Sequence, residues 1–390
     1  MKVPFFDLSP QFQLVGDEVK SALDEVFKSQ QFILGQKVEQ LEQTIAPYCQ
    51  SQYAIGVASG SDALLLSLMA LGIGPGDEVL IPPFTFFATA GAVSRVGATP
   101  VFVDIDPITY NIDPSQIEKK ITPRTKAIIP VHLFGQCCDM DPLLKIARGR
   151  EVYIIEDAAQ ALGAEYKPDA SRGRPAGAMG ELGCFSFYPT KNLGAFGDAG
   201  MVVTSNSQLA EKIRLLRTHG SKPKYYHKWI GINSRLDTLQ AAILLVKFKY
   251  LERWTLERQK RAKRYSLLFD DLLPSVPGFR LPTIQYQNRH IFNQYVIRAP
   301  ERDRLRKFLS EEGIGTDIYY PVPLHLQECY SFLNYRRGDF PVSERAAEET
   351  LALPIYPELT EEQQAHVVDR IKAFYRKRYV WGQRVKVRRL

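Results

Sequence analysis

The sequence contains no apolar run long enough to cross a membrane. Of its 390 residues 24% are charged, and no stretch approaches the roughly 20 apolar residues that span a bilayer. Residues 1–7 also lack the basic and apolar regions of a signal peptide. We therefore expect a cytoplasmic protein without a membrane partner.

Cysteine is scarce as well. The five cysteines are Cys49, Cys137, Cys138, Cys184 and Cys329. Their number is odd, their spacing does not match the paired ligands of a zinc site, and the sulfurs of the adjacent pair Cys137 and Cys138 could be joined only with strain. We expect free thiols and no bound metal.

Positive charge is in moderate excess, with a formal net charge of +7. Part of the excess lies at residues 375–390, which are rich in Lys and Arg. Such a tail is typical either of contact with nucleic acid or a membrane surface, or of a solvated terminus. Because no aromatic stacking platform or recognised nucleic-acid fold accompanies it, we expect a solvated tail at residues 378–390 and no nucleic-acid partner.

The first two thirds of the chain predict an α/β fold. Short apolar runs with β-branched residues alternate there with helical patterns, which is typical of a mostly parallel sheet covered by helices. Helices are expected between the strands, for example at residues 62–71, closed by Gly72, and at residues 142–147. The seven strand candidates are residues 53–57, 78–81, 100–104, 126–131, 152–156, 184–187 and 201–204.

The last third predicts a small α+β domain. A helical pattern at residues 238–273 meets no proline until Pro274 and is expected to lead out of the large domain. A strand at 293–298, a helix at 301–312, a Pro-rich loop at 321–323 and a last helix at 361–376 follow. We expect a large domain at residues 1–250, a small one at 251–377 and the tail at 378–390.

Polar residues that follow the predicted strands are the candidates for chemistry, because ligands of such sheets lie beyond the carboxyl ends of the strands. Gly60, Ser61 and Asp62 lie in a turn between a strand and a helix. The free N–H groups at a helix start suit a phosphate, and Ser61 or Asp62 could cap the helix. Taken alone, the turn is also consistent with a cap that binds nothing.

Asp157 ends a strand of continuous apolar character and should be shielded from water. A buried carboxylate needs a cationic partner, and a protonated pyridine nitrogen would be one. A helix cap at a strand-to-helix junction is the alternative interpretation.

Lys191 lies just past a strand, in a segment of otherwise apolar and small residues. Loss of solvent lowers the pKa of a lysine and makes it a nucleophile toward aldehydes. A surface lysine that reaches into solvent is the ordinary alternative. The glycine-rich segment 194–200 that follows is expected where backbone passes close to a ligand.

The order of phosphate turn, aspartate and lysine is more specific than any one of them. From residue 3 to about residue 377 the chain resembles the DegT/DnrJ/EryC1/StrS family of nucleotide-sugar aminotransferases, which have the aspartate-aminotransferase-like fold (fold type I) with a seven-stranded, mostly parallel mixed sheet. The segments 187–194 and 233–237 look like those of the dTDP-3-oxo-6-deoxyhexose 3-aminotransferase branch.

The resemblance implies pyridoxal 5′-phosphate as cofactor. Lys191 would form the internal aldimine and shuttle the proton, and Asp157 would pair with the ring nitrogen. Gln160 would bind the cofactor's O3′ oxygen, and Phe86 would stack on the ring, although an ordinary core aromatic is the alternative for Phe86. The phosphate would lie among Gly60, Ser61, Asp62 and Ser186.

The resemblance also implies a homodimer with shared active sites. Asn233 would reach the cofactor phosphate of the neighbouring subunit, with a loop-and-cap asparagine as the alternative. His325 would contact the sugar or diphosphate from the small domain. The remaining candidates for substrate contact are Tyr188, Tyr320, Lys222, Lys224 and His227, of which the last three lie in a basic, aromatic loop that could equally be a solvated one.

The implied reaction moves an amino group, most plausibly from L-glutamate, through pyridoxamine phosphate to C-3 of a dTDP-linked 3-keto-6-deoxyhexose. Three alternatives stay open: amination at C-4, a sugar dehydratase, and a non-catalytic regulatory relative. The family's 3-dehydrases replace the lysine by histidine, so Lys191 argues against the dehydratase. A regulatory relative would be expected to have lost Asp157, Lys191 or the phosphate turn, and all three are present.

Overall fold

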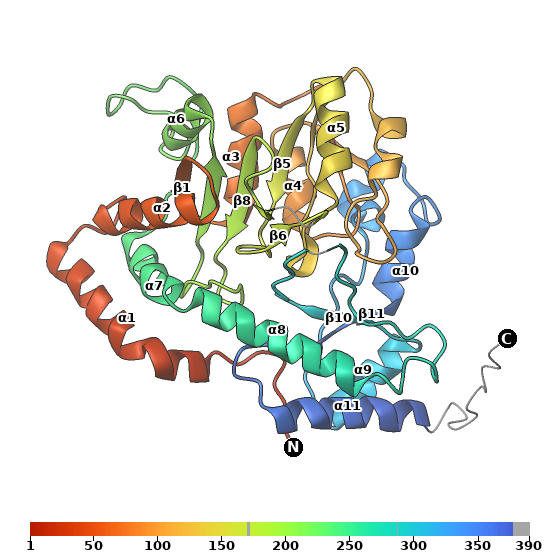
Figure 1. Ribbon diagram of the computed structural model, residues 1–390. Helices are drawn as coiled ribbons and strands as arrows, with labels where there is room; N and C mark the ends of the chain where they lie inside the picture. Colours follow the sequence, from red (N-terminus) through yellow and green to blue (C-terminus); the bar gives the residue numbers. More distant parts are fainter. Residues whose placement is uncertain (170–171, 287, 377–390) are drawn as a thin grey trace.

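A computed structural model describes residues 1–169, 172–286 and 288–376 of the chain (Figure 1). The tail predicted at residues 378–390 lies outside the described residues. Among those described, none of the helices is long and apolar enough to cross a membrane. Within the same ranges, no group of three or more His, Cys, Asp or Glu side chains could hold a metal ion. All five cysteines are free thiols.

The large domain is built on a seven-stranded sheet in the order β1-β9-β8-β5-β4-β2-β3. The four pairings from β8 across to β3 are parallel, whereas β9 runs antiparallel to both β8 and β1. The sheet is therefore mixed and mostly parallel, as predicted, and all seven predicted strands are present with slightly displaced ends. They are β1 (Tyr53–Val57), β2 (Glu78–Ile81), β3 (Thr99–Phe102), β4 (Thr125–Ile128), β5 (Tyr153–Asp157), β8 (Leu182–Ser186) and β9 (Gly200–Thr204).

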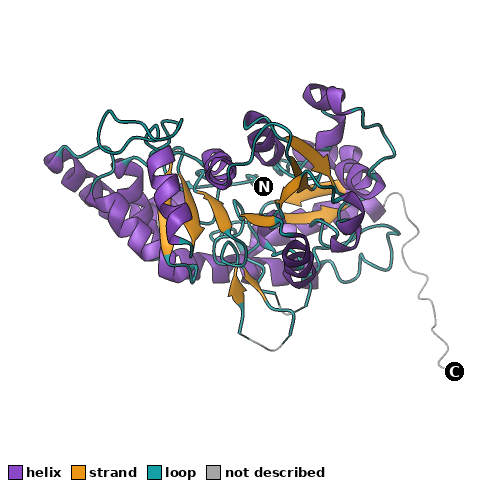
Figure 2. Ribbon diagram, turned by 90° about the horizontal axis from the view of Figure 1, so that it is seen from above, coloured by secondary structure: helices purple, strands orange, loops and turns teal. Residues whose placement is uncertain are grey.

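Both faces of this sheet are buried, because helices pack on each side (Figure 2). Ile154 belongs to one apolar cluster and its neighbour Ile155 to another, as expected where successive side chains point to opposite faces. This explains why the strands are continuously apolar rather than alternating. The helices are α2 (Gln36–Tyr48), α3 (Gly60–Leu71), α4 (Phe87–Arg95), α5 (Met140–Arg150), α6 (Ser207–Leu216) and α7 (Thr238–Phe248).

Two of the predicted helices differ in extent. α5 is longer at both ends than the predicted 142–147. The single helix predicted at 238–273 is wrong, because the chain breaks into α7 and α8 (Leu251–Leu268). At the break the N–H of Tyr250 bonds to the carbonyl of Lys247, which closes a turn, and the Tyr250 ring then stacks on Trp254 with 5.7 Å between centroids. α3 ends as predicted at Gly72, in the left-handed conformation (φ 74°).

The small lobe contains the antiparallel pair β10 (Tyr295–Arg298) and β11 (Thr350–Leu353). The predicted strand, helix and last helix appear as β10, α9 (Arg302–Glu311) and α11 (Glu361–Arg376), whereas α10 (Pro341–Glu349), β11 and the first helix, α1 (Ser9–Ser29), were not predicted. Minor elements are β6 (Glu165–Tyr166), β7 (Arg174–Pro175) and 3₁₀ turns at Pro114–Gln116, Glu118–Lys120, Leu133–Gly135, Leu324–Leu326 and Glu328–Leu333.

A buried carboxylate joins the lobes. Asp104, which follows β3, accepts hydrogen bonds from the backbone N–H groups of Val342 (3.0 Å) and Ser343 (3.0 Å) at the start of α10. These contacts hold α10 of the small lobe against the large domain. Within the small lobe, the buried Arg258 of α8 donates to the carbonyls of Phe292 (3.1 Å) and Ile355 (2.9 Å).

The predicted domain division at residues 250 and 251 falls in the turn between α7 and α8. α8 then runs from the large domain along the small lobe (Figure 1). The start of the chain packs with the small lobe, since Val3 forms a bridge to Ile314 and lies in that lobe's core.

Candidate active site

A cavity of about 590 Å³ lies at the carboxyl end of β5 and β8, between the large domain and the small lobe. This is the edge where ligands of open α/β sheets bind. Ile318 and Tyr319 line it from the small lobe, and Ser59 and Thr85 line it from the large domain. The predicted site residues that line it are Gly60, Ser61, Phe86, Asp157, Gln160, Ser186, Tyr188, Lys191 and Tyr320.

Lys191 lies in the loop between β8 and β9, where its backbone N–H bonds to the carbonyl of Tyr188 (2.9 Å). Loss of solvent lowers its pKa to about 8, although the negative charge of Asp157 acts in the opposite direction. At pH 7 roughly a tenth of such an amine is uncharged and therefore nucleophilic, a far larger share than in an ordinary lysine.

Asp157 ends β5 and is only 5% exposed. One carboxylate oxygen accepts from the hydroxyl of Thr89 (2.8 Å) and the other from the backbone N–H of Ala159 (3.2 Å). Burial raises the pKa of Asp157, and the Thr89 hydrogen bond opposes that change. Among the described residues no cation forms an ion pair with this carboxylate, so it has capacity for a positively charged ligand atom.

Thr89 was not found by sequence reasoning. It lies in α4, and its hydroxyl is 3.1 Å from that of Thr85. Thr85 precedes this helix, which begins at Phe87, so the two hydroxyls meet at the start of α4. Nothing in the sequence linked either threonine to Asp157.

The phosphate turn forms the start of α3. Ser59 caps this helix by accepting a hydrogen bond from the N–H of Asp62 (3.1 Å), which corrects the predicted cap at Ser61 or Asp62. A side chain at Gly60 would approach the Cβ of Ser186 to 2.7 Å, so only glycine fits there. The N–H groups of Gly60 and Ser61 have no partner within the helix, as at any helix start, and are available to an anion.

Asp62 does not line the cavity. Its N–H is occupied by the Ser59 cap, and its carboxylate stands in the first turn of α3, outside the lining. In this structure Asp62 takes part in the helix cap, and its contact with a phosphate stays a prediction.

Gln160 and Phe86 bracket the middle of the cavity. The amide of Gln160 accepts from the N–H of Phe134 (2.8 Å) and donates to the hydroxyl of Tyr320 (3.2 Å), so its orientation is fixed. Phe86 precedes α4 and is 56% exposed, with its ring 6.2 Å from that of Tyr320. An exposed ring at the cavity edge has a face available for stacking on a planar ligand.

The predicted substrate contact of His325 is wrong. The residue is 2% exposed and absent from the cavity lining. Its Nε2 lies 3.1 Å from Glu344, and its ring packs 4.7 Å from that of Phe340. The 3₁₀ turn at Leu324–Leu326 directs this side chain into the core, so its role is structural and not that of a substrate contact.

Four other predicted residues lie outside this chain's own cavity, on the long loop between α6 and α7 that projects from the edge of the molecule (Figure 1). Lys222 pairs with Glu211 (2.6 Å), and the Nδ1 of His227 is 2.9 Å from a backbone carbonyl of the same loop. Lys224 lies over the Tyr225 ring at 5.0 Å. The fourth residue, Asn233, is exposed.

The sequence matches the model of the DegT/DnrJ/EryC1/StrS aminotransferase family over residues 13–372. The chain belongs to this family. A "Pleiotropic regulatory protein" of Geobacillus stearothermophilus is 52% identical over 96% of this chain and 99% of its own length. The dTDP-3-amino-3,4,6-trideoxy-alpha-D-glucose transaminase of Streptomyces venezuelae is 42% identical over 98% and 97%. A UDP-N-acetyl-3-dehydro-alpha-D-glucosamine 3-aminotransferase of Acidithiobacillus ferrooxidans is 44% identical over 95% and 97%.

Solved structures agree with these matches. The crystal structure of Streptomyces venezuelae DesV in complex with a ketimine intermediate has a TM-score of 0.91 and 42% identity, covering 96% of this chain and 98% of that chain. The Bacillus subtilis protein ntda with bound cofactor PMP has a TM-score of 0.88 and 34% identity, covering 96% and 85%. The predicted family, fold type, aminotransferase activity and dependence on pyridoxal phosphate are confirmed.

Proposed function

We propose that this sugar aminotransferase moves an amino group from L-glutamate to C-3 of a dTDP-linked 3-keto-6-deoxyhexose. The observation that carries the proposal is a single cavity lined both by a lysine of lowered pKa, Lys191, and by a buried carboxylate, Asp157, that forms no ion pair among the described residues. L-Glutamate would leave as 2-oxoglutarate in the first half of the reaction, and the ketone oxygen of the sugar would leave as water in the second.

The lining residues fit pyridoxal phosphate. Asp157 offers a buried anion to a ring nitrogen, the start of α3 offers N–H groups to a phosphate, and Phe86 offers a ring face. When bound, the cofactor supplies an electron sink for the carbon that exchanges its proton. Gly60, Ser61 and Ser186 would hold its phosphate, and Gln160 its ring oxygen.

The protein's own contribution is proton transfer and orientation. An uncharged amine at the Nζ of Lys191 can take a proton from the reacting carbon and return it at the neighbouring position. The hydrogen bond between Gln160 and Tyr320 links the large domain to the small lobe, and Tyr319 lines the same side. We infer that these two tyrosines limit the access of water to the reacting atoms.

The position on the sugar and the nucleotide rest on relatives. The Streptomyces venezuelae relative is named for a dTDP-3-amino sugar and the Acidithiobacillus ferrooxidans relative for a UDP sugar, and both names place the nitrogen at C-3. These names support C-3 over C-4. We favour dTDP because the segments 187–194 and 233–237 resemble the dTDP branch.

A homodimer would complete the site. Asn233, Lys222, Lys224 and His227 lie outside the cavity of their own chain, and we propose that their loop reaches the cavity of a second copy. Exposed apolar side chains on α1, just after it and on the loop support such an interface, because contact with a second copy would remove them from water. They include Phe12 (44% exposed), Phe27 (50%), Ile33 (47%) and Ile230 (94%).

A regulatory role is the second candidate, because the 52% identical relative carries the name of a regulatory protein. Absorbance separates the two candidates. The purified protein loaded with pyridoxal phosphate should show a visible band that L-glutamate abolishes with release of 2-oxoglutarate. A band that stays unchanged over many equivalents of L-glutamate would favour the regulatory role.

The acceptor is tested with the pyridoxamine phosphate form. Offered 3-keto and 4-keto dTDP-6-deoxyhexoses side by side, it should recover the visible band only with the 3-keto sugar, and NMR of the product should place nitrogen at C-3. Amination only at C-4, or only of a UDP- or GDP-linked sugar, contradicts the specific substrate and leaves the aminotransferase assignment intact.

A further inference from the structure

The loop that carries Lys191 is attached to helix α7 by two side chains. We call residues 187–199, between β8 and β9, the lysine loop. The side-chain amide of Gln240 in α7 forms two hydrogen bonds with the backbone of Phe196: it accepts from the N–H (2.9 Å) and donates to the carbonyl (3.2 Å). Lys247 of the same helix donates to the carbonyl of Gly194. The two side chains are about two helical turns apart and therefore lie on one face of α7.

Lys247 is unusual for a helix lysine because it is only 1% exposed. Its Nζ lies 5.3 Å from the ring centre of Phe196 and 5.9 Å from that of Trp254. Burial lowers its pKa to about 8, and the more distant charge of Glu358 partly compensates. Among the described residues no carboxylate forms an ion pair with it, so its polar partners are the loop carbonyl and the two ring faces.

A buried ammonium without a paired anion is a poor way to stabilise a core, because an apolar side chain of similar length would fill the space at lower cost. Lys249, at the end of the same helix, shows the ordinary arrangement, since it is exposed and pairs with Glu18 (2.8 Å). The burial of Lys247 therefore points to a role at the loop that it contacts.

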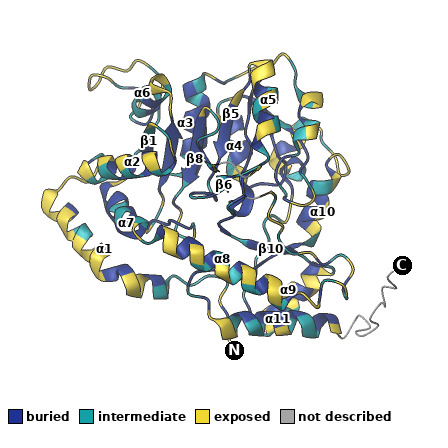
Figure 3. Cartoon of the chain, viewed as in Figure 1, coloured by how far each residue is buried: buried dark blue, intermediate teal, exposed yellow. Residues whose placement is uncertain are grey.

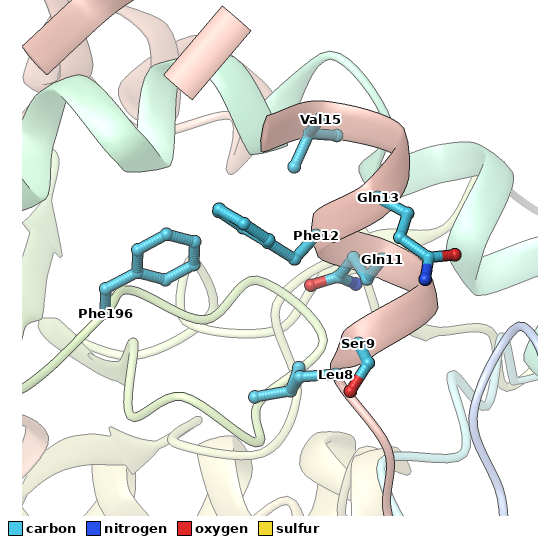
Figure 4. Close-up of a pocket in the computed structure, with 7 residues that line it drawn as sticks. All are labelled: Leu8, Ser9, Gln11, Phe12, Gln13, Val15 and Phe196. Carbon is cyan, nitrogen blue, oxygen red and sulfur yellow. The ribbon is translucent and has the colours of Figure 1, made fainter. Parts of the chain in front are cut away.

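Phe196 is held from its other side as well. Its ring lies 5.8 Å from that of Phe12 of α1, and Figure 4 shows the two rings facing each other across a pocket of about 450 Å³. The lysine loop is thus fixed between α7 on one side and α1 on the other.

Movement at Gly194 would reach Lys191. A side chain at Gly194 would come within 2.2 Å of the carbonyl of Pro189, so these two backbone segments touch. Pro189 stands in the turn closed by the bond from the N–H of Lys191 to the carbonyl of Tyr188. The loop therefore has little freedom to shift at Gly194 without shifting the lysine.

We propose that Lys247 and Gln240 are positioning residues for Lys191: from one face of α7 they hold Gly194 and Phe196 and so place the lysine amine relative to Asp157. Neither residue lines the cavity, so neither touches cofactor or substrate. The role rests on the proposed function of Lys191.

The test uses the holoenzyme and the variants Lys247→Met, Lys247→Arg and Gln240→Leu, with Lys249→Met as the matched control. Five quantities are measured: the thermal midpoint, cofactor affinity by dialysis, the pH at which the visible band of the lysine-bound cofactor titrates, and kcat and KM for L-glutamate. In Lys247→Met we expect retained folding and cofactor binding, a displaced band titration, and kcat lowered about tenfold or more with little change in KM, since small misplacements of reacting groups cost that much.

Gln240→Leu should change the same quantities in the same direction, Lys247→Arg should recover part of the loss, and Lys249→Met should match the wild type. Unchanged band titration and kcat in both Lys247→Met and Gln240→Leu would overturn the positioning role, as would cofactor loss that merely follows a fall in thermal midpoint. Failure of the proposed function is distinguishable, because a wild-type protein that forms no lysine-bound band overturns both.

Discussion

Burial shifts the pKa values of Lys191 and Asp157 in opposite directions. It lowers the pKa of Lys191 to about 8 and raises the pKa of Asp157, so each is moved toward its uncharged form. For the lysine this is useful, because the free amine is the reactive species. For the aspartate, the charged form is the useful one, because it can pair with a positively charged ligand atom. The Thr89 hydroxyl, which donates to Asp157 at 2.8 Å, favours this charged form.

The pKa of Lys191 predicts the pH dependence of cofactor capture. Because only the deprotonated amine reacts, the rate at which protein freed of cofactor forms the visible band should rise with pH and level off above about pH 8, not near the 10.4 of an ordinary lysine. Stopped-flow absorbance between pH 6 and 10 measures this. Lys191→Ala should fold and bind cofactor without forming the band of the lysine-bound cofactor. A rate that still climbs at pH 10 would contradict the lowered pKa.

Thr89 predicts how far the aspartate depends on its hydroxyl partner. Thr89→Val keeps the shape and removes the donor to Asp157, so the carboxylate should hold its charge less well. A hydrogen bond to a charged group contributes about 1.5–3 kcal/mol, which corresponds to a fall of about tenfold or more in kcat/KM for L-glutamate. Thr85→Val is the control, because its hydroxyl contacts Thr89 and not Asp157. Equal effects from both substitutions would argue for general loosening of the cavity.

Helices and strands could be predicted from the sequence where their local residues determine them, and could not where distant contacts do. The seven strands were predictable because strands buried on both faces are continuous apolar runs. The positions of Asp157 and Lys191 were predictable because Asp157 ends one such run and Lys191 lies in the loop after another. The break between α7 and α8 was not, since it contains neither proline nor glycine and depends on how Tyr250 packs on Trp254. The inward turn of His325 depends likewise on contacts with distant residues.

The start of helix α10, in the small lobe, is capped by a residue of the large domain. The buried Asp104 accepts two N–H groups of α10 and the hydroxyl of Ser343 (2.6 Å). Asp104→Ala should therefore lower the free energy of unfolding by about 1–2 kcal/mol. It should also loosen the small lobe and raise KM for the sugar, because that lobe covers the cavity.

Chemical denaturation and steady-state kinetics check both effects. Asp113→Ala is the matched control, since Asp113 caps a short surface 3₁₀ turn by accepting from Ser115 (2.9 Å) within the large domain. We expect a smaller loss of stability there and no change in KM. If Asp104→Ala behaves like Asp113→Ala, the cap does not hold the lobes together.

In the whole molecule, the candidate active-site cavity and the charged loop after α6 lie in different places. The sheet is buried, while the outer face of α1 and the loop after α6 are exposed (Figure 3). The exposed apolar side chains Phe12, Phe27 and Ile230 gain little in a solvated monomer. The loop with Lys222, Lys224 and Asn233 likewise lies outside the cavity of its own chain. Both features are accounted for if a second copy covers α1 and receives the loop.

Such a dimer predicts complementation between two inactive variants. Lys191→Ala lacks the amine, and Asn233→Ala lacks the side chain that would reach the phosphate in the partner's cavity. In a mixed dimer, one cavity receives both substitutions, and the other combines an intact Lys191 from one chain with an intact Asn233 from its partner.

Mixing, unfolding and refolding the two variants should therefore restore roughly a quarter of wild-type activity, because half of the dimers are mixed and each has one intact site. Size exclusion of each variant alone checks that both are dimers. Activity that stays at the level of the separate variants, although mixed dimers form, would show that the loop serves its own subunit or no site at all.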